Sequence, residues 1–165
     1  MRNASRVLLA VIIVFAAIPA FSQQPTTKSN SNLADVSELL MAKSKRFGEY
    51  ERDFLDYAST LDFDSLERME CRDLVDFASR IGDQLDAANL MVLVYDKVSS
   101  ARDRARIRLL IETFLNRNIS FLDVFMRGVN QSLPRITNQT IAASASRMKD
   151  DLRETKALLE SIKLP

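Results

Sequence analysis

Apolar residues recur at alternating spacings of three and four along most of the chain after residue 33. Between positions 33 and 61 they are Leu33, Val36, Leu40, Phe47, Tyr50, Phe54, Tyr57 and Leu61. The polar Lys43 is the one exception to this rhythm. Because an α-helix turns once in about 3.6 residues, the rhythm places these side chains on one face. It predicts a first helix over 33–61 with a coiled-coil-like seam that faces other helices.

A second segment with the same rhythm follows the stretch LDFDSLE. Asp64 and Glu67 have the spacing of a capping box, which predicts a helix start there. Its seam residues are Cys71, Leu74, Ala78, Ile81, Leu85, Ala88, Val92 and Tyr95. The run over 90–95 is apolar on every side, so we expect this end of the helix to be buried on several faces.

If the same rhythm continued past residue 97, it would place Arg102 and Arg106 in the core. We therefore expect the second helix to end there. Ser100 and Asp103 instead predict a helix cap. The third segment has the broad apolar face Ile107, Leu110, Ile111, Phe114, Leu115, Phe121, Leu122, Phe125, Val129 and Leu133. Pro134 lacks a backbone N–H and should end it. A fourth helix is expected to begin near 135, with the seam Ile141, Ala145, Met148, Leu152, Leu159 and Ile162.

Four amphipathic helices with short links must run antiparallel to their neighbours in the chain. We therefore predict an all-α domain over 33–165, an antiparallel up-down-up-down four-helix bundle. An alternative arrangement fuses the second and third helices into one rod and builds an elongated dimer. In outline the bundle resembles the extracytoplasmic bundles of bacterial sensors and envelope stress proteins, although no motif transfers a site from them.

The first 22 residues have the layout of a secretory signal. Arg2 and Arg6 precede an apolar run over 7–18, and Ala20 and Ser22 suit a cleavage site. The run is shorter than the ~20 residues that a membrane-spanning helix needs. We expect 1–22 to be a cleaved signal peptide, 23–32 a flexible polar tether, and the protein to be exported to the periplasm or the exterior. No later segment predicts a transmembrane span.

The composition excludes several classes of function. The chain has 23 basic and 22 acidic residues, and loss of the signal would leave 21 against 22. This balance gives no general attraction for nucleic acid, so no nucleic-acid partner is expected. With no histidine and one cysteine, a Ser-His-Asp triad, the usual zinc sites, proximal-His haem and an iron–sulfur cluster are excluded. We therefore expect neither an enzyme nor a cofactor or metal.

The single cysteine, Cys71, lies on the second seam, so we expect a buried and inert thiol. A reactive or intermolecular thiol is the alternative.

The sharpest charge feature is RDRARIR at the start of the third helix. Its four basic residues are Arg102, Arg104, Arg106 and Arg108. Positive charge at a helix N-terminus opposes the helix macrodipole. One interpretation is surface ion pairing with Glu154 and Glu160. The other is a docking patch for an anionic partner, either envelope phosphate groups or an acidic protein surface. The first functional hypothesis is therefore a non-enzymatic, exported interaction protein.

The aromatic residues of the first helix suggest a second hypothesis. Phe47, Tyr50, Phe54 and Tyr57 either pack in the core or wall a pocket for a small molecule, as in a sensor-like binding protein. Lys43, Asn118 and Asn138 interrupt apolar faces, and either fix the helix register or line a small polar cavity.

A third hypothesis is a carboxylate-dependent hydrolase, because such an enzyme needs only two acids that flank a cleft. The candidate pairs are Asp53 with Asp56, Asp62 with Asp64, and Asp150 with Asp151. All three have charged neighbours or lie at a helix cap, which favours solvated surface positions instead.

Overall fold

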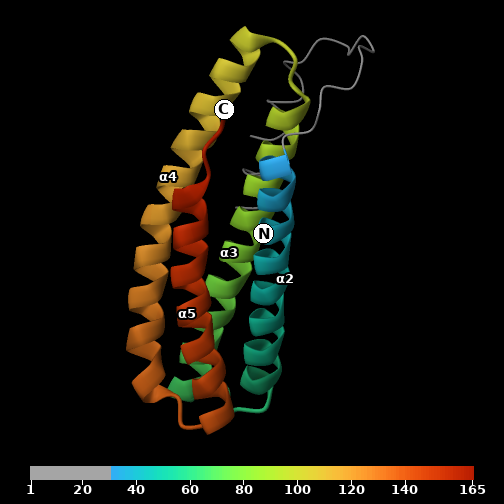
Figure 1. Ribbon diagram of the computed structural model, residues 1–165. Helices are drawn as coiled ribbons and strands as arrows, with labels where there is room; N and C mark the ends of the chain where they lie inside the picture. The colour runs from blue at the N-terminus through green and yellow to red at the C-terminus, as the bar shows by residue number, and fades with distance from the viewer. Residues whose placement is uncertain (1–30) are drawn as a thin grey trace.

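The computed structural model describes residues 31–165, which form four α-helices and one turn of 3-10 helix (Figure 1). These elements are α2 (Ser31–Ser59), α3 (Leu66–Lys97), α4 (Ala101–Ser132), η1 (Leu133–Arg135) and α5 (Gln139–Ser161). Each helix runs antiparallel to the next, and α5 returns to lie beside α2. No strand occurs in this part of the chain. The predicted all-α four-helix bundle is confirmed.

Residues 1–30 lie outside the described part of the chain, and so do the predicted signal peptide over 1–22 and most of the predicted tether over 23–32. Helix α2 begins at Ser31, so the last two residues of that tether are helical. Among the described helices, none combines the length and the hydrophobicity that a membrane crossing requires.

The predicted seams form the core. Phe54 and Met148 are completely buried, and they come from the first and last helices. The largest fully buried side chains are Tyr50, Tyr95, Phe47, Phe54, Leu40, Leu74, Ile81, Leu85, Ile111, Leu122, Met148 and Leu152. Removing such a side chain from water contributes about 1.5–3 kcal/mol. Burial of the seams is therefore the main source of stability.

The start of α3 differs from the predicted capping box. Ser65, rather than Asp64, is the N-cap, and its hydroxyl accepts from the Arg68 N–H at 3.2 Å. Glu67 does not reach back to the cap. Its carboxylate instead accepts hydrogen bonds from the Thr137 hydroxyl at 2.6 Å and the Thr137 N–H at 2.8 Å, so it joins the first turn of α3 to the link between η1 and α5. The predicted box is wrong because Glu67 has tertiary partners that its sequence neighbours do not reveal.

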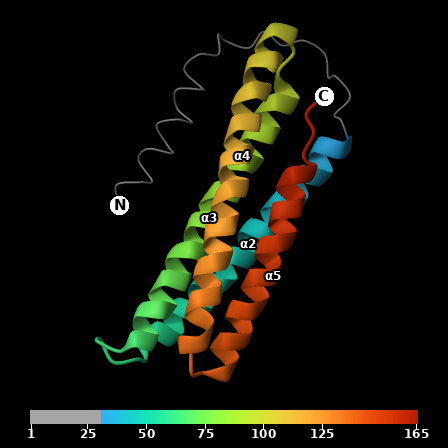
Figure 2. The same cartoon turned by 90° about the vertical axis from the view of Figure 1, so that its left-hand side faces the viewer.

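The predicted break between the second and third helices is confirmed. Val98 is extended and ends α3, and the Ser100 hydroxyl caps α4 by accepting from the Asp103 N–H at 3.4 Å. The chain then reverses, so α3 and α4 lie side by side (Figure 2). The alternative of one fused rod is therefore wrong.

Four side chains that we expected to be buried lie at the surface. Leu90 is 46% exposed, Leu93 41%, Leu110 56% and Phe121 37%. Helices α3 and α4 have 32 residues each and α5 has 23. At 1.5 Å per residue, α3 and α4 are about 14 Å longer, and α5 does not cover their far ends. Phe121 lies lower on α4, where its ring stacks on Phe125 at 6.4 Å between ring centroids.

Helix α5 begins four residues later than expected. Helix α4 ends at Ser132, and Pro134 lies in the η1 turn. Asn138 is the N-cap of α5, and its side-chain oxygen accepts from the Thr140 and Ile141 N–H groups at 2.9 and 3.2 Å. Asn138 is therefore a cap and not a seam residue.

The four residues after α5 run past the overhanging ends of α3 and α4 (Figure 1). Leu164 is buried in the core. The hydroxyl of Tyr95 donates a hydrogen bond to the carbonyl oxygen of Pro165. This segment ties α5 to the far end of α3 and shapes the surface there.

Candidate functional site

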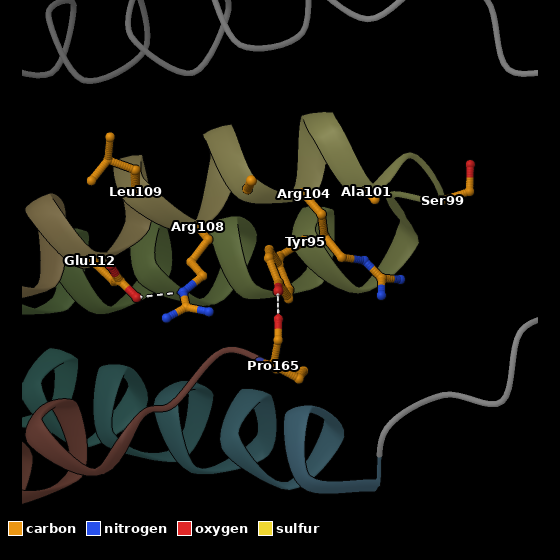
Figure 3. A pocket seen from close by; sticks show the side chains of 9 residues that line it. Tyr95, Ser99, Ala101, Arg104, Arg108, Leu109, Glu112 and Pro165 are labelled. Atoms are coloured by element: carbon orange, nitrogen blue, oxygen red, sulfur yellow. Dashed lines mark hydrogen bonds and ion pairs between the residues drawn. The ribbon is translucent and has the colours of Figure 1, made fainter.

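A groove of about 540 Å³ lies at the α3–α4 end of the bundle (Figure 3). It is lined by Tyr95, Ser99, Ala101, Arg104, Ala105, Arg108, Leu109, Glu112 and Pro165. We call it the arginine groove. Its size is within the ~300–1,000 Å³ range of ligand sites in proteins. It combines residues of α3, α4 and the segment after α5.

Only half of the predicted arginine patch belongs to this groove. Arg104 and Arg108 are four residues apart, so they lie on the same face of α4, and both line the groove. Arg102 and Arg106 are exposed and are absent from its lining. The structure therefore divides the patch into a groove pair and an outer pair.

Two contacts, with Val98 and with Tyr95, hold the side chain of Arg104 in place. Its Nε donates to the carbonyl oxygen of Val98 at 2.9 Å, and its guanidinium carbon lies 5.8 Å from the centroid of the Tyr95 ring. The hydrogen bond engages one of the five N–H donors of a guanidinium. The side chain is thus oriented, while most of its donor capacity is not used by this bond.

Arg108 pairs with Glu112 one turn further along α4, with 2.7 Å between Nε and Oε1. Both side chains are about half exposed, and such pairs contribute only ~0.3–0.5 kcal/mol. Neither predicted partner pairs with the four arginines within the described residues. Glu154 instead lies 2.5 Å from Nζ of Lys43. That ion-pair prediction is wrong because α5 ends short of this part of α4.

The candidate pocket aromatics of α2 occupy the core rather than the arginine groove. Phe47, Tyr50 and Phe54 are buried. Tyr50 lies 6.0 Å from Phe47 and 6.2 Å from Phe54 between ring centroids. Tyr57 is half-buried, and its hydroxyl donates to Glu67 at 3.1 Å. The rings pack on one another, which favours the interpretation as core.

A polar cluster joins α2 to α5 beside these rings. The Tyr50 hydroxyl donates to Oδ2 of Asp151 at 2.6 Å, and Lys43 lies 2.8 Å from Oδ1. Burial alone would raise the pKa of Asp151, but bonds from Lys43 and Tyr50 hold it below its usual value. Burial, together with Asp151, raises the pKa of Tyr50 to about 12. Lys43 therefore bridges α2 and α5, which favours the register interpretation over that of a cavity lining.

Asn118 is buried, and its side chain donates to the Phe114 carbonyl oxygen at 2.9 Å. A cavity of about 10 Å³ lies beside it, with Gln84 and Thr155 also in the lining. This is about the space of one water molecule. Thr155 is fully buried, and its hydroxyl has no hydrogen-bond partner within residues 31–165. The cavity is too small for an organic ligand.

Cys71 is fully buried, as predicted. Burial, with smaller contributions from Glu67 and Glu70, raises the pKa of its thiol to about 11. The reactive thiolate is therefore scarce near neutral pH.

The carboxylate pairs do not form a common site. Asp150 pairs with Arg153 at 2.7 Å, whereas Asp151 belongs to the α2–α5 cluster. Asp53, Asp56, Asp62 and Asp64 are exposed. Within the described residues, no cluster of three or more acidic or thiol side chains is placed to hold a metal ion.

Sequence reasoning missed most of the groove lining. The spacing of Arg104, Arg108 and Glu112, four residues each, was the signal that separates the groove pair from the outer pair. Tyr95 and Pro165 are 70 positions apart, and no local pattern joins them. Only the tertiary fold brings them together.

Comparison with known proteins does not supply a function. A function has to be argued from the geometry and charge of the site. No protein-family model matches the chain, and no curated protein or solved structure matches it either.

Proposed function

We propose that this chain is an exported, non-enzymatic binding protein whose arginine groove docks an acidic segment of a protein partner. The observation that carries the proposal is the placement of Arg104 and Arg108 in one groove beside the exposed apolar side chains of Ala105 and Leu109. A guanidinium forms paired hydrogen bonds with a carboxylate, which makes arginine suited to recognise acidic groups.

The spacing of the two arginines favours a peptide ligand. Four residues along an α-helix correspond to about 6 Å. In an extended peptide, side chains two residues apart are separated by about 6.6 Å. Two carboxylates at alternate positions would therefore match the backbone spacing of Arg104 and Arg108, whose guanidinium groups point apart along α4 in Figure 3 and would turn toward the ligand.

The walls of the groove favour a protein over a membrane surface. Arginine is enriched at the centres of protein interfaces. Leu109 lines the groove and is more than half exposed, so it adds apolar area for a partner. The near balance of basic and acidic residues gives no general attraction to an anionic bilayer.

Fluorescence anisotropy with a labelled Glu-Gly-Glu-Gly-Glu peptide tests the proposal. We expect Arg104→Glu with Arg108→Glu to weaken binding about tenfold or more, because two like charges then face the carboxylates. The matched control is Arg102→Glu with Arg106→Glu, which changes the net charge equally outside the groove. It should bind about as well as the unchanged protein. Circular dichroism verifies that both variants fold.

A single substitution acts in the opposite direction. Glu112 competes with the peptide for Arg108, so Glu112→Gln should strengthen binding. Equal losses in the groove variant and the control would contradict the proposal, since only overall charge would then matter. Binding to phosphatidylglycerol vesicles without binding to the peptide would instead indicate a membrane partner.

A further inference from the structure

The opposite end of the bundle carries an exposed phenylalanine between two aspartates. We call Asp62, Phe63 and Asp64 the acidic turn, which lies in the link between α2 and α3. Phe63 is 76% exposed, the highest value among the large apolar side chains of the described residues, and both aspartates are exposed. The N–H of Ser65 donates to the Asp62 carbonyl oxygen at 3.1 Å and closes the turn.

The bundle holds the acidic turn in place but does not bury its ring. The Arg68 guanidinium carbon lies 5.1 Å from the Phe63 ring centroid, and the same side chain donates to the Leu61 carbonyl oxygen at 2.9 Å. Leu66 and Met69 are about half exposed next to it. An ordered apolar group flanked by charges has the character of an interface residue.

We propose that the protein partner is a second copy of this chain, whose acidic turn docks in the arginine groove. This inference rests on the proposed function of the groove. The charges are complementary, since two carboxylates meet two guanidinium groups. The α-carbons of Asp62 and Asp64 are at most about 7 Å apart, which is close to the ~6 Å between the backbone positions of Arg104 and Arg108 along α4.

The ring of Phe63 has an apolar surface to pack on in the groove. Ala105 and Leu109 line the groove, and both side chains are exposed. Burial of an aromatic side chain contributes about 1.5–3 kcal/mol. Phe63 therefore supplies the apolar anchor, and the aspartates orient it.

The two surfaces lie at opposite ends of the bundle, so they cannot meet within one molecule (Figure 1). Contact between different surfaces of identical chains is heterologous, and it continues as an open chain unless the rotation closes a ring. We expect the contact of one three-residue turn with one groove to bury less than the ~1,200 Å² of stable interfaces. The assembly is therefore reversible, depends on concentration, and weakens in high salt.

Sedimentation velocity of the purified protein over a range of concentrations tests this inference. The unchanged protein should form oligomers whose mean mass rises with concentration. Arg104→Glu with Arg108→Glu disables the groove, and Asp62→Asn with Asp64→Asn disables the turn without creating a charge that attracts the altered groove, so each variant should remain monomeric. Arg102→Glu with Arg106→Glu is the matched control and should assemble normally.

A mixture of the two disabled variants gives the sharpest result. One keeps its acidic turn and the other keeps its groove, so the mixture should form one-to-one dimers that cannot grow further. A mixture that stays monomeric would overturn the inference, as would a monomeric unchanged protein. Peptide binding that persists without self-association would leave the proposed function intact and reject only the identity of the partner.

Discussion

Gly128 on α4 and Phe77 on α3 approach so closely that a β-carbon at position 128 would lie 2.6 Å from Cε2 of Phe77. The Phe77 ring lies 5.2 Å from the Phe125 ring between centroids, so it fills the space that the glycine leaves. Glycine is costly in a helix, yet here it permits the contact between two helices.

Gly128→Ala should destabilise the bundle by about 1 kcal/mol. Overpacking costs about 1–3 kcal/mol, and the higher helix propensity of alanine returns ~1 kcal/mol of it. Gly48→Ala is the matched control, because a β-carbon at position 48 meets nothing within 4 Å. It should stabilise by about 1 kcal/mol. Urea unfolding measures the unfolding free energy of both variants. An equal increase in the two variants would show that Phe77 moves aside without loss of stability.

The α2–α5 cluster predicts acid sensitivity. The pKa of Asp151 is lowered in the folded state, so its contribution is complete above its ordinary pKa of about 3.9 and is lost as the pH falls further. Asp151→Asn should therefore reduce the unfolding free energy at pH 7 by about 1–3 kcal/mol. The unfolding free energy of this variant should also fall less steeply below pH ~4 than that of the unchanged protein.

Asp150→Asn is the control for this experiment, because Asp150 is exposed and pairs only along its own helix with Arg153. Its effect should remain within about 0.5 kcal/mol. The pKa of Asp83 is raised, chiefly by burial. Its protonation as the pH falls therefore stabilises the folded protein, which is opposite to the effect of Asp151. An acid profile that is unchanged in Asp151→Asn would contradict the assigned role of the cluster.

Cys71 should report unfolding. Its thiol is buried and its pKa is about 11, so a disulfide reagent at pH ~8 should react slowly with the native protein. In urea, one thiol per chain should react rapidly. The labelling rate should follow the fraction of unfolded protein, and fast labelling without denaturant would reveal an accessible thiol.

Thr155→Val should stabilise the protein by about 1 kcal/mol, because it removes a buried hydroxyl that lacks a partner within residues 31–165. Thr113→Val is the matched control, since the Thr113 hydroxyl is exposed and donates to the Leu109 carbonyl oxygen at 2.8 Å. It should change thermal stability little. A destabilised Thr155→Val protein would indicate that the hydroxyl has a partner in solution.

Periodicity predicted the bundle because burial of a helix face leaves a direct trace in the sequence. Phe54 and Met148 were correctly assigned to the core, and the loss of phase near Arg102 located the α3–α4 link. The same reasoning failed for Leu110, because periodicity defines which face is apolar but not how far a neighbouring helix extends.

The candidate site was only partly predictable. The run of four arginines was visible, but its division between groove and outer surface follows from helix geometry and from the position of Tyr95 on α3. Phe63 showed no signal, since an exposed aromatic in a link has the same sequence context as a buried one. Such positions depend on tertiary placement, which spacing alone does not encode.

Glu67 has a mechanical consequence. From α3 it binds the connection to α5 through Thr137 and Asn138, and it also accepts a hydrogen bond from Tyr57 on α2. One carboxylate thus braces both hairpins at the base of the acidic turn. A pull on that turn should therefore be resisted in part by the link to α5, and not by α2 and α3 alone.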